Sequence, residues 1–261
     1  MGPKTSQRRQ FYSDHAPGLS VLQTECVVHV STDVSDPRVV SVSPYITEGQ
    51  LCDRYEAIPT ASINDVLRRE GLLHQVLPPS ISSQAPGIHL AGIAFTIKGS
   101  KSLKLHDEMP ERAEMLESIP RNAVCVWDTS NDDESAQWGE IMTMAAQRQG
   151  ARGAVVDGGL RDTEKVLGLD FPVFSRYLTS NGMLGRFRMA GWQTPIRIGQ
   201  VTIQPGDVIV GDADGVIVIP RAIAVDILTA AEALVAHEVE VRSMVTEGIE
   251  PREVVARGGC F

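Results

Sequence analysis

Residues 138–162 read W-G-E-I-M-T-M-A-A-Q-R-Q-G-A-R-G-A-V-V-D-G-G-L-R-D, and this stretch decides the fold that we expect. Apolar side chains at i, i+3, i+4 and i+7 predict a helix over residues 135–149. These apolar residues are Trp138, Ile141, Met142 and Ala145. The run at 153–157 predicts a buried strand, and the Gly158-Gly159 pair predicts a sharp turn at its end. A helix leading into a buried strand is typical of an α/β fold, in which ligands bind beyond the strand's carboxyl end.

The rest of the chain continues this alternation and then changes to short strands. Predicted strands lie at 88–97, 123–127, 172–174, 196–203, 207–210 and 216–219, and predicted helices at 60–71, 108–118 and 221–246. Residues 20–46 are interpreted as a hairpin or arm. This order predicts a mixed α/β domain. Because no G-x-G-x-x-G follows a strand and no P-loop sequence occurs, a Rossmann or P-loop nucleotide site is not expected.

Composition narrows the class of protein. With 261 residues and 43% hydrophobic content, the chain can bury a sizeable core. Its formal net charge of −9 argues against broad binding to nucleic acid or to an anionic membrane. No run approaches the ~18 apolar residues of a membrane span, and no apolar signal segment follows the basic N-terminus. The cysteines are scattered, so we expect thiols in a reducing compartment and a cytoplasmic protein.

Arg161 and Asp162 are the side chains that point to chemistry. A guanidinium can clamp a carboxylate through two hydrogen bonds. A carboxylate can hold a hard divalent cation whose other positions are filled by water. Glu140, near the start of the preceding helix, lies where unpaired backbone N–H groups favour an anion. These parts suit a 2-oxo acid, whose keto oxygen needs a cation to stabilise an enolate. The alternative is structural: Asp162 could simply begin a helix as its cap.

The spacing Glu140-x20-Arg161-Asp162 resembles the D/E-x20-R-D signature of the class II pyruvate aldolases related to 4-hydroxy-4-methyl-2-oxoglutarate aldolase. The regulator of ribonuclease activity A shares this RraA-like fold family. The resemblance spans residues 50–248. Supporting segments are S-I-N-D at 62–65, G-A-V-V-D-G at 153–158, F-P-V-F at 171–174, P-G-D at 205–207 and D-A-D-G-V-I-V-I-P at 212–220.

The resemblance implies a fold and an assembly. The fold is an α/β sandwich of the swivelling β/β/α type, in a homotrimer or homohexamer with active sites between subunits. Residues 1–48 have no counterpart in the family and are expected to form an N-terminal extension, arm or lid, which leaves residues 49–261 as the RraA-like aldolase domain.

The resemblance also implies roles for particular residues. Asp162 would bind Mg²⁺ or Mn²⁺, and Arg161 would bind the substrate carboxylate and enolate oxygen. Glu140 would orient water at the metal and assist proton transfer. The backbone amides that would hold the pyruvyl carboxylate are those of Gly139, Glu140, Ile141 and Met142.

The leading hypothesis is therefore a divalent-metal-dependent lyase that cleaves a carbon–carbon bond of a 4-hydroxy-2-oxo acid to give pyruvate. Oxaloacetate decarboxylation would accompany it, since both reactions pass through the same enolate. The alternative is a non-catalytic protein of the same fold that regulates a ribonuclease. The complete Glu140-Arg161-Asp162 set favours the enzyme.

Glu238 and three lysines are further candidates for catalytic side chains. Family enzymes also use a carboxylate from a neighbouring subunit, for which Glu238 is the candidate; its structural alternative is an ion pair with Arg242 at i+4. Lys98, Lys101 and Lys104 follow a strand and could include a Schiff-base lysine, but alternating lysines there are expected to be solvated.

Overall fold

The computed structural model describes residues 46–105 and 108–261. The hairpin expected at 20–46 therefore lies almost wholly outside the described residues. The division between an extension at 1–48 and a domain at 49–261 stays a prediction. The first described helix, α1, spans Glu48–Glu56 and begins with a Thr47 capping box that the sequence reading missed.

A mixed sheet forms the centre of the fold, with the strand order β1-β6-β5-β3-β2-β10-β11 among the described residues. Its strands are β1 Ser82–Ser83, β2 Leu90–Lys101, β3 Ala123–Asp128, β5 Gly153–Leu160, β6 Val173–Leu178, β10 Val208–Asp212 and β11 Gly215–Ile219. Two short strands join from the side: β4 Ala136–Trp138 pairs with β5, and β7 Phe187–Trp192 pairs with β2. β8 Ile196–Ile198 and β9 Val201–Ile203 form a separate hairpin.

Strands β2, β3, β5 and β6 are parallel to one another, and β3 and β5 are buried along their whole length. Such burial on both faces requires continuous apolar sequence, which is why these strands were predictable. Along β2, Ile93 and Phe95 face helices, whereas Leu90 and Ala94 face the β8–β9 hairpin. The mixed α/β architecture expected from the sequence is confirmed.

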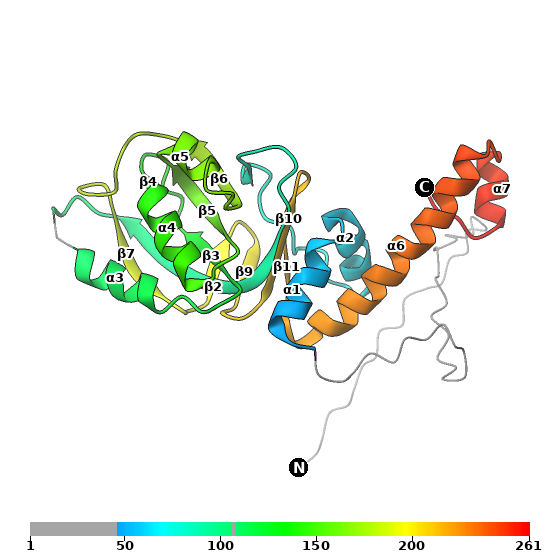
Figure 1. Ribbon diagram of the computed structural model, residues 1–261, viewed down its shortest axis with the longest axis horizontal. Helices are drawn as coiled ribbons and strands as arrows, with labels where there is room; N and C mark the ends of the chain where they lie inside the picture. The colour runs from blue at the N-terminus through cyan, green and yellow to red at the C-terminus, as the bar shows by residue number, and fades with distance from the viewer. Residues whose placement is uncertain (1–45, 106–107) are drawn as a thin grey trace, which may run out of the picture.

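The helices form two groups over the sheet. Figure 1 shows α3 Met109–Glu117, α4 Glu140–Gln149 and α5 Thr163–Leu167 at one end, and α1, α2 Thr60–Arg69 and the start of α6 Ala224–Thr246 at the other. The 3₁₀ turn Arg221–Ile223 precedes α6, and α7 Pro251–Ala256 follows it. α2 has no cap from its own side chains; instead the Asp212 carboxylate accepts hydrogen bonds from the Thr60 N–H at 2.8 Å and its hydroxyl at 2.7 Å.

Three local predictions were wrong. The strand expected over 196–203 is two strands, β8 and β9, which pair as a hairpin. The helix expected over 135–149 begins only at Glu140, because residues Ala136–Trp138 form β4 and Gly139 is fully extended. The Gly158-Gly159 pair is no turn: β5 runs through it to Leu160, with an irregularity in its pairing to β6. Glycine is needed there for close approach, since a Cβ on Gly158 would lie 2.1 Å from Gln137 Oε1.

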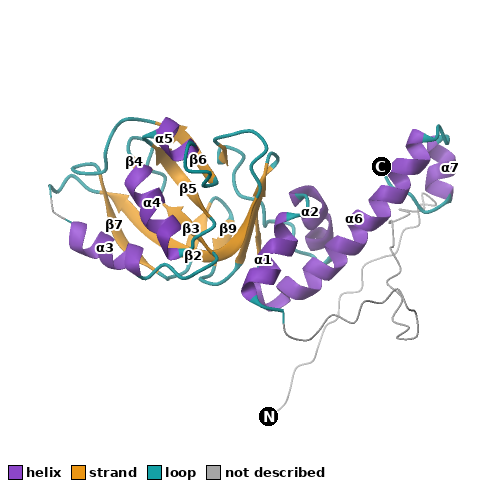
Figure 2. Cartoon of the chain, in the orientation of Figure 1, coloured by secondary structure: helices purple, strands orange, loops and turns teal. Residues whose placement is uncertain are grey.

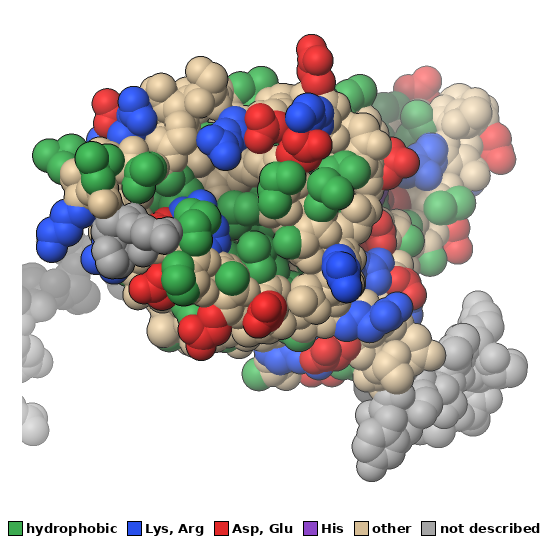
Figure 3. All heavy atoms as spheres, turned by 60° about the vertical axis from the view of Figure 1, so that its left-hand side comes forward, with side chains coloured by type: hydrophobic (Ala, Val, Ile, Leu, Met, Phe, Trp, Pro, Cys, Tyr) green, Lys and Arg blue, Asp and Glu red, His purple; other side chains and the backbone are tan. Residues whose placement is uncertain are grey.

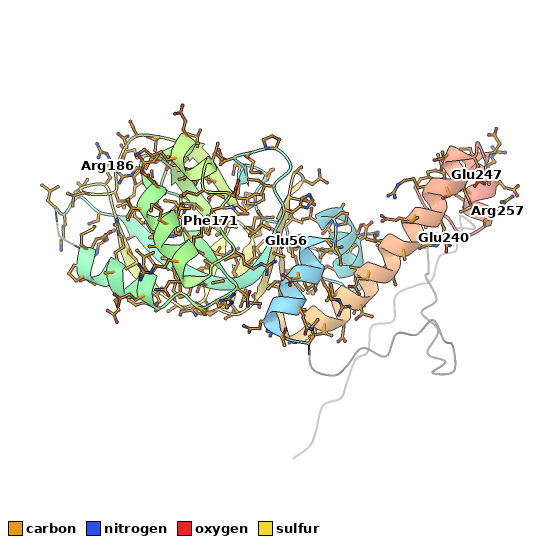
Figure 4. All side chains as sticks on the ribbon, in the orientation of Figure 1. Glu56, Phe171, Arg186, Glu240, Glu247 and Arg257 are labelled. Atoms are coloured by element: carbon orange, nitrogen blue, oxygen red, sulfur yellow. The ribbon has the colours of Figure 1, made fainter. Side chains whose placement is uncertain are left out.

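The end of α6 leaves the sheet. Ile227, Ala231 and Leu234 are buried, whereas Val245 is 49% exposed, so the buried residues of α6 lie in its first half. Figure 2 shows α6 and α7 projecting from the body, and Figure 4 places Glu240 and Glu247 on this projection. No helix among the described residues is long and apolar enough to cross a membrane. Cys52 and Cys125 are free and buried, while Cys260 is disulfide-bonded, contrary to the expectation of scattered thiols.

Candidate active site

Strands β4 and β5 bring the two halves of the Glu140-x20-Arg161-Asp162 pattern together. They are parallel, with Trp138 opposite Leu160, so the segments that follow the two strands leave the sheet at the same edge. The Arg161 N–H donates to the Trp138 carbonyl oxygen at 3.1 Å. The indole of Trp138 stacks on Phe171, with ring centroids 6.3 Å apart; Figure 4 shows Phe171 beside α4. Residues separated by twenty positions in sequence are therefore neighbours at one strand edge.

Asp162 occupies the N-cap position of α5, as the structural alternative expected, but its side chain does not cap the helix. Its backbone is left-handed, with φ 55° and ψ 34°, and its side chain makes no capping hydrogen bond to α5. The carboxylate instead lies beside Gly139, where a Cβ would come within 3.0 Å of Asp162 Oδ2. It forms a loose ion pair with Arg161, in which Asp162 Oδ2 lies 3.5 Å from Arg161 Nε. A carboxylate held by strained backbone without a close partner is available to a ligand.

Glu140 is the first residue of α4, nearer the helix start than the predicted helix over 135–149 placed it, and its carboxylate is held by a residue that the sequence analysis missed. Lys165 Nζ on α5 donates to Glu140 Oε2 at 2.8 Å. This hydrogen bond raises the pKa of Lys165, so the lysine stays charged. The sequence does show a lysine four positions after Arg161, but nothing in the sequence indicates that this lysine pairs with Glu140.

The first turn of α4 presents unpaired backbone donors. Gly139 has no side chain to cap α4. The helical hydrogen bonds begin with the Thr143 N–H, which donates to the Gly139 carbonyl oxygen. The N–H groups of Glu140, Ile141 and Met142 therefore precede the helical ladder and favour an anion. Gly139, Ile141 and Met142 line the pocket described next.

A pocket of about 800 Å³ opens at this edge. Both Arg161 and Asp162 line it, together with Gly139. Glu140 is not part of its wall, and its carboxylate lies against Lys165 instead. Figure 3 shows this face of the molecule, hollowed and surrounded by hydrophobic side chains with a few charges. The structure thus brings together the predicted guanidinium, carboxylate and helix amides.

The residues present fit a magnesium or manganese ion. No cluster of three His, Cys, Asp or Glu side chains suited to a metal occurs within residues 46–105 and 108–261. Mg²⁺ needs no such cluster, because it is commonly held by one or two carboxylates with water and substrate oxygens. Asp162, whose side chain is 41% exposed and loosely paired, is the residue that would hold it.

The remaining candidates from the sequence are three lysines and Glu238. Lys98 and Lys101 pair with Asp128 and Asp133, at 3.6 and 2.6 Å, and are about half exposed, so neither has the desolvated setting of a Schiff-base lysine. Lys104 lines the pocket but is exposed. Glu238 accepts a hydrogen bond from Ser62 at 3.4 Å rather than pairing with Arg242, and its role across a subunit boundary stays a prediction.

Comparison with known proteins settles the family. The family model described as RraA-like (Aldolase/RraA) matches residues 60–218. The chain belongs to the RraA-like family. Protein DlpA of Legionella pneumophila is 29% identical to this RraA-like chain over 189 residues, which cover 72% of the chain but only 30% of DlpA. A proposed 4-hydroxy-4-methyl-2-oxoglutarate aldolase of Halalkalibacterium halodurans is 33% identical over 168 residues, covering 64% of this chain and 75% of that protein.

A solved structure extends the comparison. A crystal structure described among novel cellulases from microbes associated with the gut ecosystem is 42% identical to the RraA-like chain, with a TM-score of 0.73. The match covers 77% of this chain and 90% of that one.

Proposed function

We propose that this RraA-like protein is a divalent-metal-dependent lyase that cleaves a 4-hydroxy-2-oxo acid to pyruvate and a carbonyl compound. One observation carries the proposal: Arg161 and Asp162, which follow β5, line the same pocket as the amino end of α4, which follows β4. A carboxylate, a cation and helix amides are the groups that a 2-oxo acid needs around its reacting end. The relatives named as aldolases support the same class of reaction.

The residues of this chain bind and orient the 2-oxo acid. The Arg161 guanidinium and the amides of Glu140, Ile141 and Met142 hold the C1 carboxylate, and Asp162 would hold Mg²⁺ or Mn²⁺. The bound ion supplies a Lewis acid that polarises the C2 oxygen and stabilises negative charge there. With the C1–C2 unit fixed, Arg161 also faces the C2 oxygen on which charge develops.

Bond cleavage then follows from proton movements. The C4 hydroxyl loses its proton, the C3–C4 electron pair moves to form the C2–C3 double bond of an enolate, and the carbonyl product leaves. The enolate takes up a proton at C3 to give pyruvate. Glu140, fixed by Lys165, is the carboxylate that we assign to assisting the proton transfers through water.

Oxaloacetate decarboxylation uses the same parts. There the C3–C4 electron pair is left on the pyruvate enolate as carbon dioxide departs, and the enolate again takes a proton at C3. The reaction needs no aldehyde site, so it tests the Arg161–Asp162 end alone.

The deciding experiment measures pyruvate release, coupled to lactate dehydrogenase, from oxaloacetate and from 4-hydroxy-4-methyl-2-oxoglutarate. Each assay is run with Mg²⁺, with Mn²⁺ and after EDTA, and a blank without protein subtracts metal-catalysed decarboxylation. We expect release that needs metal and is lost in Arg161→Lys, which keeps the charge but not the two-pronged guanidinium. Absence of release from both substrates, with capture of a ribonuclease by the intact protein, would reverse the assignment toward the regulator.

A further inference from the structure

The pocket is larger than the proposed reacting group requires. Its volume of about 800 Å³ lies in the range of sites that enclose whole drug-sized ligands. The pyruvyl half of a substrate occupies only the corner formed by Arg161, Asp162 and the amino end of α4. The remaining space must therefore receive the other half of the molecule, which carries C4 and its substituents.

The wall of this remaining space is mostly apolar. Trp138, Met183 and Phe187 are buried beneath it, and Leu116 is half-buried on α3. Four apolar side chains at the pocket are strongly exposed: Leu105 at 81%, Met109 at 53%, Ile141 at 71% and Leu184 at 62%. Figure 3 shows hydrophobic side chains both within the hollow and around it.

The two buried or half-buried charged side chains of the α3 wall, Glu108 and Arg112, are paired with each other. Glu108 forms an ion pair with Arg112, and its other carboxylate oxygen accepts a hydrogen bond from the Met189 N–H at 3.1 Å. Arg112 also contacts the Met183 sulfur at 3.6 Å. This arrangement fixes α3 against β7 and neutralises the Arg112 guanidinium with the Glu108 carboxylate, while the buried Arg112 Nε has no hydrogen-bond partner. Lys104 and Arg188 line the pocket as exposed side chains.

We infer that the part of the pocket beyond Arg161 is a subsite for an apolar substituent at C4 of the substrate. The carbonyl product released there is an aliphatic or aromatic aldehyde or ketone without a carboxylate of its own. This inference rests on the proposed lyase function and names its substrate class. Burial of apolar surface against these side chains favours such a group, whereas a carboxylate would lose its water beside an Arg112 whose charge Glu108 already neutralises.

The test is a series of 4-hydroxy-2-oxo acids that differ only at C4. The substituents are hydrogen, methyl, propyl and phenyl, and the carboxylate-bearing member is 4-hydroxy-4-methyl-2-oxoglutarate. We expect kcat/KM for pyruvate release to rise by about fourfold per added buried methylene. The carboxylate-bearing member should fall at least about tenfold below the phenyl compound, since the buried cation Arg112 is already neutralised by Glu108.

Oxaloacetate decarboxylation distinguishes a failure of the apolar subsite from a failure of the proposed lyase function. Metal-dependent decarboxylation with a flat series, or with the carboxylate-bearing substrate preferred, overturns the apolar subsite and leaves the lyase standing. Failure of oxaloacetate and of every aldol substrate together overturns the proposed function itself.

A pair of variants localises the subsite. Ala113 and Glu114 are neighbouring exposed residues of α3, but only Ala113 lines the pocket. Ala113→Phe should fill the space, lowering kcat/KM for the phenyl substrate about tenfold or more while oxaloacetate decarboxylation stays within about threefold. Glu114→Phe should change neither. An equal loss on both substrates, or a changed oligomer size with an unchanged substrate ratio, overturns the inference, because the apolar rim would then be covered by a second copy.

Discussion

The carboxamide of Gln137 on β4 is hydrogen-bonded to the backbone of Gly159 on β5: Gln137 Oε1 accepts from the Gly159 N–H at 3.0 Å. The same side chain is 1% exposed and donates through Nε2 to Asp132 Oδ2 at 2.7 Å and to Ser135 Oγ at 3.1 Å. One strand leads to Gly139 and the other to Arg161. Gln137 therefore fixes the separation of the two halves of the candidate site.

Gln137→Leu should damage both stability and turnover. It leaves the Gly159 N–H and one Asp132 interaction unpaired in a buried setting, which costs about 2–4 kcal/mol of unfolding free energy. Displacement of Arg161 relative to the amino end of α4 should lower kcat/KM by about 10- to 100-fold. Thermal unfolding and pyruvate release measure the two effects. Gln147→Leu, which removes an exposed hydrogen bond to the Leu169 carbonyl, is the matched control and should be near neutral. Lost stability with unchanged kcat/KM would restrict Gln137 to a structural role.

Gly158→Ala tests the same contact from the other side. The added methyl would lie 2.1 Å from Gln137 Oε1 and 2.9 Å from Thr129 Cγ2, so the carboxamide must shift. We expect a loss of about 1–3 kcal/mol in unfolding free energy from this overpacking, together with reduced activity. Gly191→Ala in β7 has open space around its Cβ and serves as the control for replacing a strand glycine. Equal stability of the two variants in urea titrations would contradict the close packing.

The sheet was predictable because parallel strands buried on both faces must be apolar throughout, as β3 and β5 are. The start of α4 was not. Trp138 fits a helical stripe with Ile141 and Met142, yet it belongs to a strand, and Ile141 is 71% exposed at the pocket. Periodicity over so few residues cannot separate a short strand from the first turn of a helix.

The residues of the candidate site that belong to one sequence motif could be predicted from their spacing. Arg161, Asp162 and Gly139 meet as expected because a strand-helix-strand unit returns the chain to the same edge. Lys165 and Gln137 were missed because their partners, Glu140 and Gly159, are chosen by side-chain reach across elements. Sequence spacing carries no information about such contacts until the register of β4 on β5 is known.

Asp162→Asn is a sharper test of metal binding than Asp162→Ala. Asn tolerates left-handed backbone, whereas Ala at φ 55° would add strain of about 1–2 kcal/mol and confuse folding with binding. Asn also removes the negative charge that a divalent cation requires. We expect Mn²⁺ binding, followed by calorimetry, to weaken at least about tenfold, with the melting temperature of the metal-free protein unchanged. Undiminished Mn²⁺ affinity would move the metal site elsewhere.

Lys165→Met should impair turnover more than substrate binding. The Lys165 side chain does not line the pocket, but its Nζ holds Glu140 Oε2 at 2.8 Å. Loss of this contact frees the Glu140 side chain to rotate, and a mispositioned proton carrier lowers kcat by about 3- to 30-fold. KM for oxaloacetate should stay within about twofold, because the groups that bind it are intact. Lys165→Arg keeps a donor at this position and should restore most of the rate; a rise in KM with unchanged kcat would contradict the assignment of Glu140 to proton transfer.

Cys52 on α1 should make the fold sensitive to alkali. Its side chain is fully buried, and burial raises the pKa of the thiol from 9.0 to about 11. The folded chain therefore keeps a proton that the unfolded chain releases above pH 9. Unfolding free energy is unaffected below pH 9 and falls as pH rises toward 11, by up to about 2–3 kcal/mol for this one group. Urea unfolding at pH 8, 9, 10 and 11 should show a shallower decline for Cys52→Ala than for the unmodified protein, even though the variant is less stable at pH 8 through lost packing. Parallel declines for the two proteins would mean that the Cys52 thiol is no harder to ionise in the folded chain than in the unfolded one.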